Sequence, residues 1–269
     1  MPLLPTMPKF EAPSFTLEGK IVVQCGASGP LGTALAHGVA SGGATLVLAT
    51  RDDKRVAPDL MSARYKHPVS VLPVDITDED AVVRLADTVI ARCGRVDGLV
   101  YNVVSHTMRD VDGDRSQWAE SMRVNANGLF FVMRAFARAM ARQEAGGSIV
   151  NIASIHGRVG MNPFLYEGLD FGAAPDYFFH KGGMLNLTRY LASFYGTRRV
   201  RINTVSPGGI YNDGNPQPEK FVERYNAMTM LGRMARPDEI PGAVVFLLSD
   251  ASRYITGADI LIDGGYSAK

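Results

Sequence analysis

The chain has 269 residues, of which 46% are hydrophobic, and this content is enough to fill the core of one sizeable α/β domain. Its 28 basic and 27 acidic residues leave a net charge of +1, so no excess of charge favours a nucleic-acid or membrane partner. Cys25 and Cys93 are the only cysteines, too few for a disulfide framework and not in metal-ligand spacing, which suits a reducing compartment and a small-molecule partner.

Residues 1–16 are predicted to form an extended tail, because Pro2, Pro5, Pro8 and Pro13 interrupt any apolar run. Lys9 is the only basic residue there, so neither a secretory leader nor a transit helix is indicated. No later stretch reaches the roughly 18 uninterrupted apolar residues that span a bilayer. We therefore expect residues 17–269 to form one cytoplasmic domain.

From residue 20 onwards, short runs rich in β-branched residues alternate with longer segments of helical pattern. The predicted strands are 20–25, 45–49, 69–74, 98–101, 148–152, 201–205 and 259–262. The predicted helices are 31–41, 53–66, 78–93, 115–142, 175–196 and 237–249. Seven strands separated by helices predict an α/β fold of Rossmann type. In such a doubly wound parallel sheet, the ligand binds at the carboxyl ends of the strands.

A glycine-rich turn follows the first predicted strand and leads directly into a helix. Its residues are Gly26, Ala27, Ser28, Gly29, Pro30, Leu31 and Gly32. In this context, backbone amides can approach a pyrophosphate at the helix N-terminus. The alternative interpretation is a tight turn between strand and helix that binds nothing.

Tyr177 and Lys181 are four residues apart in the predicted helix 175–196, so their side chains lie on one face, with Cβ atoms roughly 5–6 Å apart. A neighbouring cation favours the phenolate, so we expect the pKa of Tyr177 to fall. A phenol with a lowered pKa is suited to general acid/base chemistry on a carbonyl/alcohol pair. The pair alone is a weak pattern, because tyrosines and lysines are common enough to meet this spacing by chance.

The predicted helix 175–196 has apolar side chains around its whole circumference, so it must be buried on more than one side. One side can pack on the sheet. The other needs a partner, for which we expect a second subunit; cover by a local loop is the alternative.

Taken together, these motifs resemble the short-chain dehydrogenase/reductase family, from about Leu17 to the C-terminus. Gly26 and Gly32 match its glycine motif. Further matches follow in the family's order: Asp75-Ile76 after the third strand, Asn102 after the fourth, Asn125, Ser154, the pair Tyr177 and Lys181, Ser206-Pro207-Gly208-Gly209-Ile210, and the ending Asp263-Gly264-Gly265.

The chain departs from the family pattern in the glycine turn and again after the fourth strand, where Tyr101-Asn102-Val103-Val104 matches the expected Asn-Asn-Ala-Gly only at Asn102. Cys25 replaces a threonine, and Pro30 replaces the middle glycine. Because proline has no N–H, Pro30 can start a helix but cannot donate to a phosphate. Val104 stands where the family has glycine, so its bulk is expected to crowd the ribose side of the cleft.

The resemblance implies a nicotinamide-dependent enzyme with the catalytic residues Asn125, Ser154, Tyr177 and Lys181. In this scheme Tyr177 exchanges the proton of the reacting oxygen, Ser154 donates a hydrogen bond to it, and Asn125 holds a water that links Lys181 to solvent. The implied cofactor contacts are Gly26, Ser28, Gly29, Leu31, Gly32, Arg51, Asp75, Ile76, Asn102, Tyr177, Lys181, Pro207, Gly208 and Ile210. The branch of the family with this ending is commonly tetrameric, so a homotetramer is expected.

The end of the second strand predicts the cofactor preference. An acidic side chain there binds a ribose 2′-hydroxyl, whereas a basic one accommodates a 2′-phosphate. Thr50 stands where NAD-preferring members carry Asp, and Arg51 follows it, which favours NADP over NAD. Asp52 keeps NAD open, because its carboxylate can neutralise Arg51 or bind the ribose.

The interval between Ser154 and Tyr177 is longer than is common in the family, and its segment 162–170 is rich in polar side chains. We interpret this segment as a polar wall that selects a sugar, sugar acid or polyol, with His156 and Glu167 as substrate contacts. A likeness to gluconate-type members of the family is looser. The alternatives are a surface loop that only helps assembly and, for the substrate, a 3-oxoacyl thioester.

A function of another class stays open on the same fold, namely a nucleotide-sensing protein without catalysis, because a fold does not determine its function. The presence of Asn125, Ser154, Tyr177 and Lys181 argues against it. The five histidines share no helical ligand spacing such as His-x-x-x-His, so no metal site is predicted.

Overall fold

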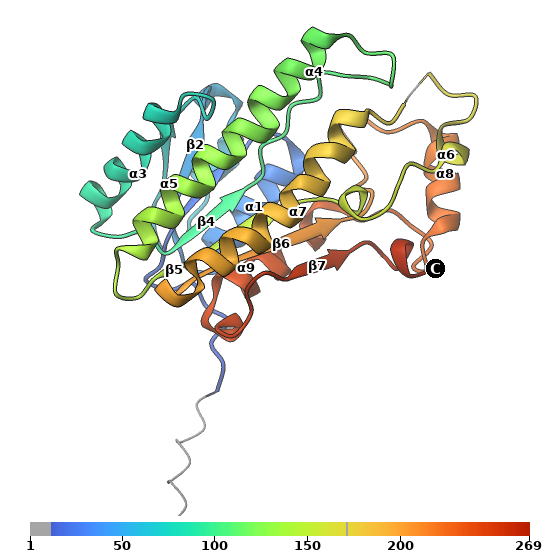
Figure 1. The fold of residues 1–269 in the computed structure, drawn as a ribbon. Coiled ribbons are helices and arrows are strands. Elements are labelled where there is room, and N and C mark those ends of the chain that lie inside the picture. Colours follow the sequence, from blue (N-terminus) through green and yellow to red (C-terminus); the bar gives the residue numbers. More distant parts are fainter. Residues whose placement is uncertain (1–11, 171) are drawn as a thin grey trace, which may run out of the picture.

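The computed structural model describes residues 12–170 and 172–269. Most of the predicted tail, residues 1–11, lies outside the described residues. The fold is a single α/β domain whose seven strands form one parallel sheet in the order β3-β2-β1-β4-β5-β6-β7 (Figure 1). The predicted Rossmann-type sheet is therefore confirmed.

The elements follow the alternation read from the sequence. The strands are β1 Ile21–Cys25, β2 Thr45–Thr50, β3 Val69–Pro73, β4 Gly98–Tyr101, β5 Gly147–Ile152, β6 Val200–Pro207 and β7 Asp259–Ile262. The α-helices are α1 Gly29–Ser41, α2 Pro58–Ser62, α3 Glu79–Cys93, α4 Arg115–Met122, α5 Leu129–Ala141, α6 Pro163–Tyr166, α7 Pro175–Tyr195, α8 Glu219–Met228 and α9 Pro241–Leu248.

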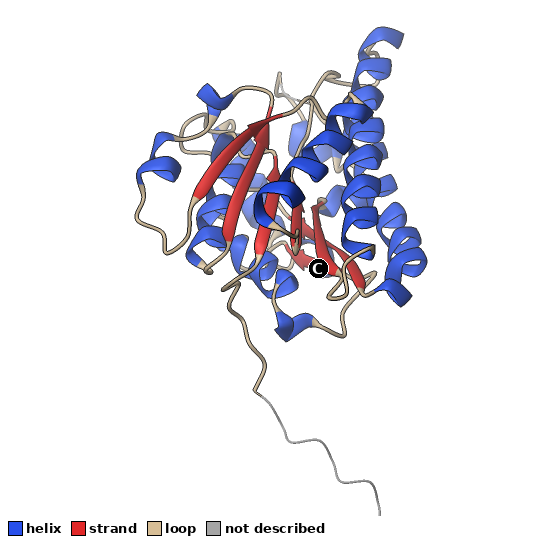
Figure 2. Ribbon diagram, turned by 90° about the vertical axis from the view of Figure 1, so that its left-hand side faces the viewer, coloured by secondary structure: helices blue, strands red, loops and turns tan. Residues whose placement is uncertain are grey.

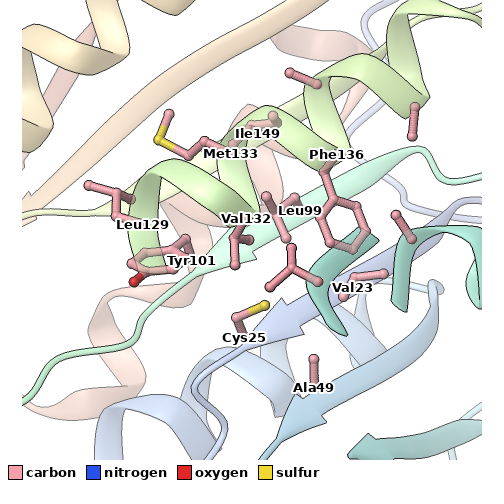
Figure 3. Close-up of a cluster of buried hydrophobic side chains, with 14 of the residues drawn as sticks. Val23, Cys25, Ala49, Leu99, Tyr101, Leu129, Val132, Met133, Phe136 and Ile149 are labelled. Atoms are coloured by element: carbon pink, nitrogen blue, oxygen red, sulfur yellow. The ribbon is translucent and has the colours of Figure 1, made fainter. Parts of the chain in front are cut away.

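Helices cover both faces of the sheet, so the inner strands are largely buried, whereas the edge strands β3 and β7 are partly exposed (Figure 2). One apolar layer joins the sheet to α3, α5 and α7, and the other joins it to α1, α2 and α9. Figure 3 shows part of the first layer, where Phe136, Met133 and Val132 of α5 lie over strand residues such as Leu99 and Val23. Near-continuous apolar strands are what a parallel sheet covered on both faces requires.

The strand order reverses between β1 and β4, which lie side by side in the sheet although β2 and β3 separate them in the sequence. Right-handed crossovers place α1 on one face and α5 on the other (Figure 1). Loops that leave the carboxyl ends of β1 and β4 must therefore diverge, and a crevice opens between them.

Three predicted helices differ from the observed ones. The predicted helix 115–142 is interrupted by a π-helical segment, Arg123–Gly128, which separates α4 from α5. The predicted helix 53–66 is reduced to a 3₁₀ turn and α2, because Pro58 can only begin a helix. The predicted helix 237–249 divides into the 3₁₀ turn Pro237–Glu239 and α9, which begins at Pro241.

Two helices were not predicted, and both belong to long connections. Helix α6 lies between β5 and α7, and α8 follows β6; the two pack against each other beside the carboxyl ends of the strands (Figure 1). Their contact is an apolar cluster separate from the two sheet layers, which we call the α6–α8 cluster. Its buried residues are Ile155, Leu165, Phe221, Tyr225, Met234 and Tyr266.

The outer face of α7 carries aromatic side chains that the single chain leaves exposed. Phe179, Tyr190 and Phe194 are each more than half exposed. Trp118 of α4 lies against Phe179, with ring centroids 5.3 Å apart. No described loop covers this outer face, so cover by a local loop is not seen, and the expected second subunit stays a prediction.

Candidate functional site

A cavity of about 900 Å³ lies at the carboxyl ends of the central strands. It is lined by residues that follow β4, β5 and β6, by the N-terminal half of α7, and by the two long connections. Of the residues predicted to act in the site, nine line this one cavity: Leu31, Asn102, Ser154, His156, Tyr177, Lys181, Pro207, Gly208 and Ile210. The other residues predicted for the site do not line the cavity.

The glycine turn after β1 is built for close backbone approach. Gly26 has φ of +87°, and a Cβ there would lie 2.7 Å from the carbonyl carbon of Asn102. The Asn102 side chain in turn donates to the carbonyl oxygen of Gly26 at 3.1 Å. A Cβ on Gly32 would lie 2.7 Å from the same carbonyl oxygen. The loops after β1 and β4 are thus joined directly at the crevice, and neither glycine can be replaced without moving the backbone.

The start of α1 is suited to an anion. Gly29 has φ of +82° and open space where a Cβ would be, and Pro30 occupies the first turn as predicted. Ser28 is the N-cap residue, yet within the described chain its hydroxyl makes no capping hydrogen bond, and the first turn of α1 carries no acidic residue. A phosphate is the kind of group that such a helix start accommodates.

Beyond β2, Arg51 is exposed and Asp52 does not pair with it. The carboxylate of Asp52 accepts a hydrogen bond from the backbone N–H of Lys54 at 3.0 Å and caps the following 3₁₀ turn. The Arg51 charge acts instead on Asp75. Hydrogen bonds from Thr77 lower the pKa of Asp75, and the charges of Arg51 and Arg123 act in the same direction.

Asp75 and Ile76 follow β3 at the same edge of the sheet. Asp75 is exposed, and its carboxylate accepts hydrogen bonds from the N–H and the hydroxyl of Thr77. Ile76 is buried at 6% exposure, and a Cβ on Gly128 would lie 2.7 Å from its side chain. Ile76 therefore packs into the core beneath the π-helical segment, whereas Asp75 faces outward.

Ser154, Tyr177 and Lys181 meet in the cavity from two elements. Ser154 follows β5, and its hydroxyl accepts a hydrogen bond from the backbone N–H of His156 at 3.2 Å. Tyr177 and Lys181 lie on one face of α7, with the ammonium 5.5 Å from the centre of the phenol ring. The ammonium donates to the carbonyl oxygen of Ile152, at the end of β5, over 2.7 Å. This bond fixes α7 to the strand that carries Ser154.

The pKa values of this pair differ from the sequence prediction. Burial raises the pKa of Tyr177, and the hydrogen bond with Ser154 lowers it by a smaller amount. Burial also lowers the pKa of Lys181 to about 7. The prediction of a lowered phenol pKa treated Lys181 as a fully charged neighbour, whereas desolvation disfavours the charged form of both groups.

Asn125 lies in the π-helical segment and is buried at 1% exposure. Its side-chain oxygen accepts from the backbone N–H of Ser105 at 2.8 Å, and its amide donates to the carbonyl of Ser105 and the hydroxyl of Ser121. The side chain therefore ties the loop after β4 to the helix. It does not line the cavity, so any hold that Asn125 has on a water there would come from its backbone.

Three histidine rings border Tyr177, one of them His180 of α7, which meets the phenol ring edge-on at 5.3 Å. His106, from the loop after β4, stacks on the phenol ring with centroids 5.4 Å apart and an interplanar angle of 23°. His156 approaches the same ring edge-on, at 6.1 Å. Val104, which replaces a family glycine, is 38% exposed and lines the cavity.

Glu167, a predicted substrate contact, does not line the cavity. It follows α6 as an exposed residue outside the cavity lining, and its backbone carbonyl accepts a hydrogen bond from Arg224 at 2.8 Å. Glu167 is the C-cap residue of the short helix α6, and this helix was not predicted. Asp170, from the same segment, does line the cavity.

Several cavity residues were not predicted because nothing in their sequence context marks them. They come from the loop after β4 and from the connection through α8: His106, Arg109, Asn212, Asn215, Gln217 and Tyr225. The length of these connections was the only available signal. Across residues 12–170 and 172–269, no group of three or more His, Cys, Asp and Glu side chains could hold a metal ion. No helix in this part of the chain has the length and apolarity needed to cross a membrane.

Comparison with known proteins gives consistent matches over almost the whole chain. A protein-family model described as Enoyl-(Acyl carrier protein) reductase matches residues 26–267. The chain is 34% identical over 262 residues to the NADP-dependent mannitol dehydrogenase of Hypocrea jecorina, with 95% of each chain covered. It is 32% identical over 253 residues to a 3-oxoacyl-(acyl-carrier-protein) reductase of Thermotoga maritima, with 93% of this chain and 98% of that one covered.

Among solved structures, a similar one is the gluconate 5-dehydrogenase from Burkholderia cenocepacia J2315 in complex with NADP and tartrate. Its TM-score is 0.84 at 26% sequence identity, and the match covers 95% of this chain and 98% of that chain. The likeness therefore includes both long connections as well as the sheet.

The buried histidines generate a prediction about stability in acid. Burial lowers the pKa of His156 to about 4 and that of His180 to about 3. An unfolded histidine has a pKa of about 6.5, so below this pH the unfolded chain binds protons that the folded chain does not. Stability is thus complete above about pH 6.5, and below it each residue reduces the free energy of unfolding by up to about 1.4 kcal/mol per pH unit.

Urea denaturation between about pH 4.5 and 6.5 measures this slope. His180→Leu is expected to give a shallower slope than the wild type, because one of the two groups no longer titrates. An equal slope in wild type and variant would show that His180 is not buried as a neutral ring.

Proposed function

The chain belongs to the short-chain dehydrogenase/reductase family, and from this premise we propose that it is an NAD(P)-dependent oxidoreductase that interconverts a secondary alcohol and a ketone. The observation that carries the proposal is that Ser154, Tyr177 and Lys181 line one cavity at the carboxyl ends of the strands. Their presence also argues against a protein that only senses nucleotides.

In the proposed reaction Tyr177 is the general acid and base. Its hydroxyl exchanges a proton with the substrate oxygen, and Ser154 donates a hydrogen bond to that oxygen where negative charge develops. Ser154 is positioned for this task because its oxygen already accepts from the N–H of His156, which leaves its proton for donation. A bound nicotinamide would supply the hydride to the ketone or accept it from the alcohol.

Lys181 would bind the ribose hydroxyls and stabilise the phenolate. With a pKa of about 7, it can lose or take up a proton near neutral pH, so it can also pass protons between Tyr177 and solvent. We propose that Asn125 supports this route through its backbone, because its side chain is engaged with Ser105 and Ser121. A π-helical segment changes the pairing of the helix carbonyls and occurs frequently at functional sites.

The chain's own residues fit a dinucleotide. The free Ser28 hydroxyl, the open space at Gly29 and the start of α1 suit the pyrophosphate, and Asp75 lies where the adenine contact is expected. We propose NADP as the preferred form, with NAD as the alternative. Arg51 supports this choice. The carboxylate of Asp52 caps the 3₁₀ turn through the N–H of Lys54 and does not pair with the Arg51 guanidinium.

For the substrate, we propose a sugar, sugar acid or polyol. The cavity lining includes Asp170, Asn212, Asn215 and Gln217, whose side chains can pair with hydroxyl groups. When a bound substrate covers such groups, one that leaves them unpaired is disfavoured. The mannitol dehydrogenase among the relatives supports the polyol choice, whereas the 3-oxoacyl reductase keeps a thioester as the second candidate.

We also propose a cytoplasmic homotetramer. The support is the exposed aromatic face formed by Phe179, Tyr190 and Phe194 of α7 together with Trp118 of α4. An apolar face of this kind on a folded chain marks a protein contact, and a second copy of the same face is its natural partner.

Replacing the proposed general acid tests the mechanism. Tyr177→Phe is expected to lower kcat by about 10²- to 10⁴-fold, because the phenol proton is lost while the ring remains. Cofactor affinity, measured by titration of reduced-nicotinamide fluorescence, should stay close to that of the wild type. Activity above about a tenth of wild type would rule out Tyr177 as the acid.

Replacing Arg51 tests the cofactor preference. Arg51→Ala is expected to lower kcat/KM with NADP by roughly ten- to a hundredfold and to leave NAD turnover nearly unchanged, because a charged hydrogen bond to the 2′-phosphate is lost. Arg55→Ala, an exposed arginine of the same segment, is the matched control. If both variants keep the wild-type ratio between the cofactors, Arg51 does not determine it.

Two acidic residues of one segment test the substrate class. Asp170→Leu is expected to lower kcat/KM for polyols by roughly tenfold, because a hydrogen-bonding group of the cavity is lost, and to leave an acetoacetyl thioester unaffected. Glu167→Leu, outside the cavity, should change neither. Efficient thioester reduction with little polyol turnover in the wild type would establish the second candidate instead.

A further inference from the structure

Four aromatic rings connect both long connections with the C-terminal end of the chain. Tyr166 of α6 lies 5.5 Å from Phe221, Phe221 lies 5.9 Å from Tyr225, and Tyr225 stacks on Tyr266 at 5.0 Å and 20°. This chain of rings is the centre of the α6–α8 cluster. It makes α6, α8 and the C-terminal turn one packed unit, and three of its rings, those of Tyr166, Phe221 and Tyr225, line the cavity.

Tyr225 also contacts the loop that follows β6. Its hydroxyl accepts a hydrogen bond from the backbone N–H of Gly209. A Cβ on Gly209 would lie 2.7 Å from the ring carbon that bears this hydroxyl, and a Cβ on Gly208 would lie 2.9 Å from the hydroxyl oxygen. Neither glycine has positive φ, so the need for room explains them, and the need for a left-handed backbone does not. Besides Tyr225, a Cβ on Gly208 would lie 2.9 Å from the Asp263 backbone, and one on Gly209 would lie 2.9 Å from the Met234 side chain.

Other polar groups of this loop bond to backbone, except that the carbonyl of Ile210 accepts from the Gln217 side chain at 2.8 Å. The N–H of Gly208 donates to Ile262 of β7 at 2.9 Å, and the carbonyl of Gly209 accepts from Ala235 at 2.9 Å. The N–H of Gly209 is thus the point at which a side chain from α8 holds the loop. Burial raises the pKa of Tyr225, so its hydroxyl keeps its proton and acts as a neutral acceptor.

We propose that Tyr225 is a positioning residue that sets the loop Pro207–Ile210 against the nicotinamide and couples it to the unit of α6 and α8. The proposal rests on the proposed function, because this loop borders Ser154, Tyr177 and Lys181 in the same cavity. A substrate that contacts the α8 side of the cavity moves the aromatic unit, and the Tyr225 hydroxyl carries that movement to the amide of Gly209. Substrate specificity and hydride geometry are then linked through one hydrogen bond.

The first experiment separates the hydroxyl from the ring. Tyr225→Phe keeps the stack and leaves the N–H of Gly209 without its acceptor, whereas Tyr266→Phe removes a hydroxyl from the same stack that has no bond to the loop. Isothermal titration compares NADP with 2′-phospho-ADP-ribose, which lacks only the nicotinamide, and NAD with ADP-ribose in parallel. Tyr225→Phe should weaken binding of the complete cofactors roughly three- to tenfold and leave the truncated ones unchanged. Tyr266→Phe should change neither.

The second experiment reads the geometry of the reaction. With a saturating polyol, Tyr225→Phe should lower kcat roughly ten- to a hundredfold, because small displacements of the reacting atoms are costly. The primary deuterium isotope effect on kcat should rise, since hydride transfer becomes slower relative to product release. A lower melting temperature with unchanged kcat, isotope effect and nicotinamide affinity would show a structural role only and overturn the proposal.

The third experiment tests the contact with the glycine. Gly209→Ala should be strongly impaired, because its methyl group meets the Tyr225 ring. Gly209→Ala combined with Tyr225→Leu should bind the nicotinamide as well as Tyr225→Leu alone, since the ring is gone. If the double variant is as impaired as Gly209→Ala, another neighbour explains the glycine. A wild type that binds cofactors without turnover would refute the proposed function, and the binding comparison would still decide the role of Tyr225.

Discussion

Burial of an ionisable pair on α7 is the constraint on which the site depends. On one face of the helix Lys181 is buried and Tyr177 is half-buried, and the ammonium is held by the carbonyl of Ile152 at the end of β5. Gly157 allows this approach, because a Cβ there would lie 2.8 Å from the backbone carbonyl of Lys181. Helix α7, strand β5 and the turn after Ser154 are therefore locked together, and desolvation moves both pKa values towards neutral forms. A bound cofactor and substrate would therefore act on a pair whose protonation they can still change.

The parallel sheet could be predicted, because its largely buried inner strands leave apolar runs between helical segments and the crossovers between strands have one hand. The short helices α6 and α8 could not, since their apolar residues pack on each other and not on the sheet. The π-helical segment Arg123–Gly128 could not be predicted either, because the helical periodicity of the sequence continues across it. For the site, positions tied to strand ends, such as Asn102 and Ser154, were placed correctly in the cavity. Glu167 was not, because it belongs to a connection whose path depends on the tertiary packing of α6.

The departures from the family pattern are absorbed locally. Pro30 occupies the first turn of α1, where a missing N–H costs nothing, and Gly26 and Gly32 keep the close approach that the turn needs. Tyr101 fills the core beside Cys25, where Figure 3 shows its ring between the sheet and α5. Its hydroxyl is buried without a hydrogen-bond partner among the described residues, so the crevice is supported by apolar bulk at this point. Val104 adds bulk on the cavity side of the same loop.

The π-helical segment has a consequence for how the chain tolerates changes in length. One residue turns an α-helix by about 100°, so a deletion within 123–128 that restored regular pairing would rotate α4 against α5 by that angle. Trp118 would leave Phe179, and Asn125 would leave the loop after β4. The extra residue thus lets α4 and α5 face different directions: α4 presents Trp118 beside Phe179 on the exposed side, and α5 packs on the sheet. Insertions and deletions in this family are accordingly expected in the connections on either side of the π-helical segment and not within it.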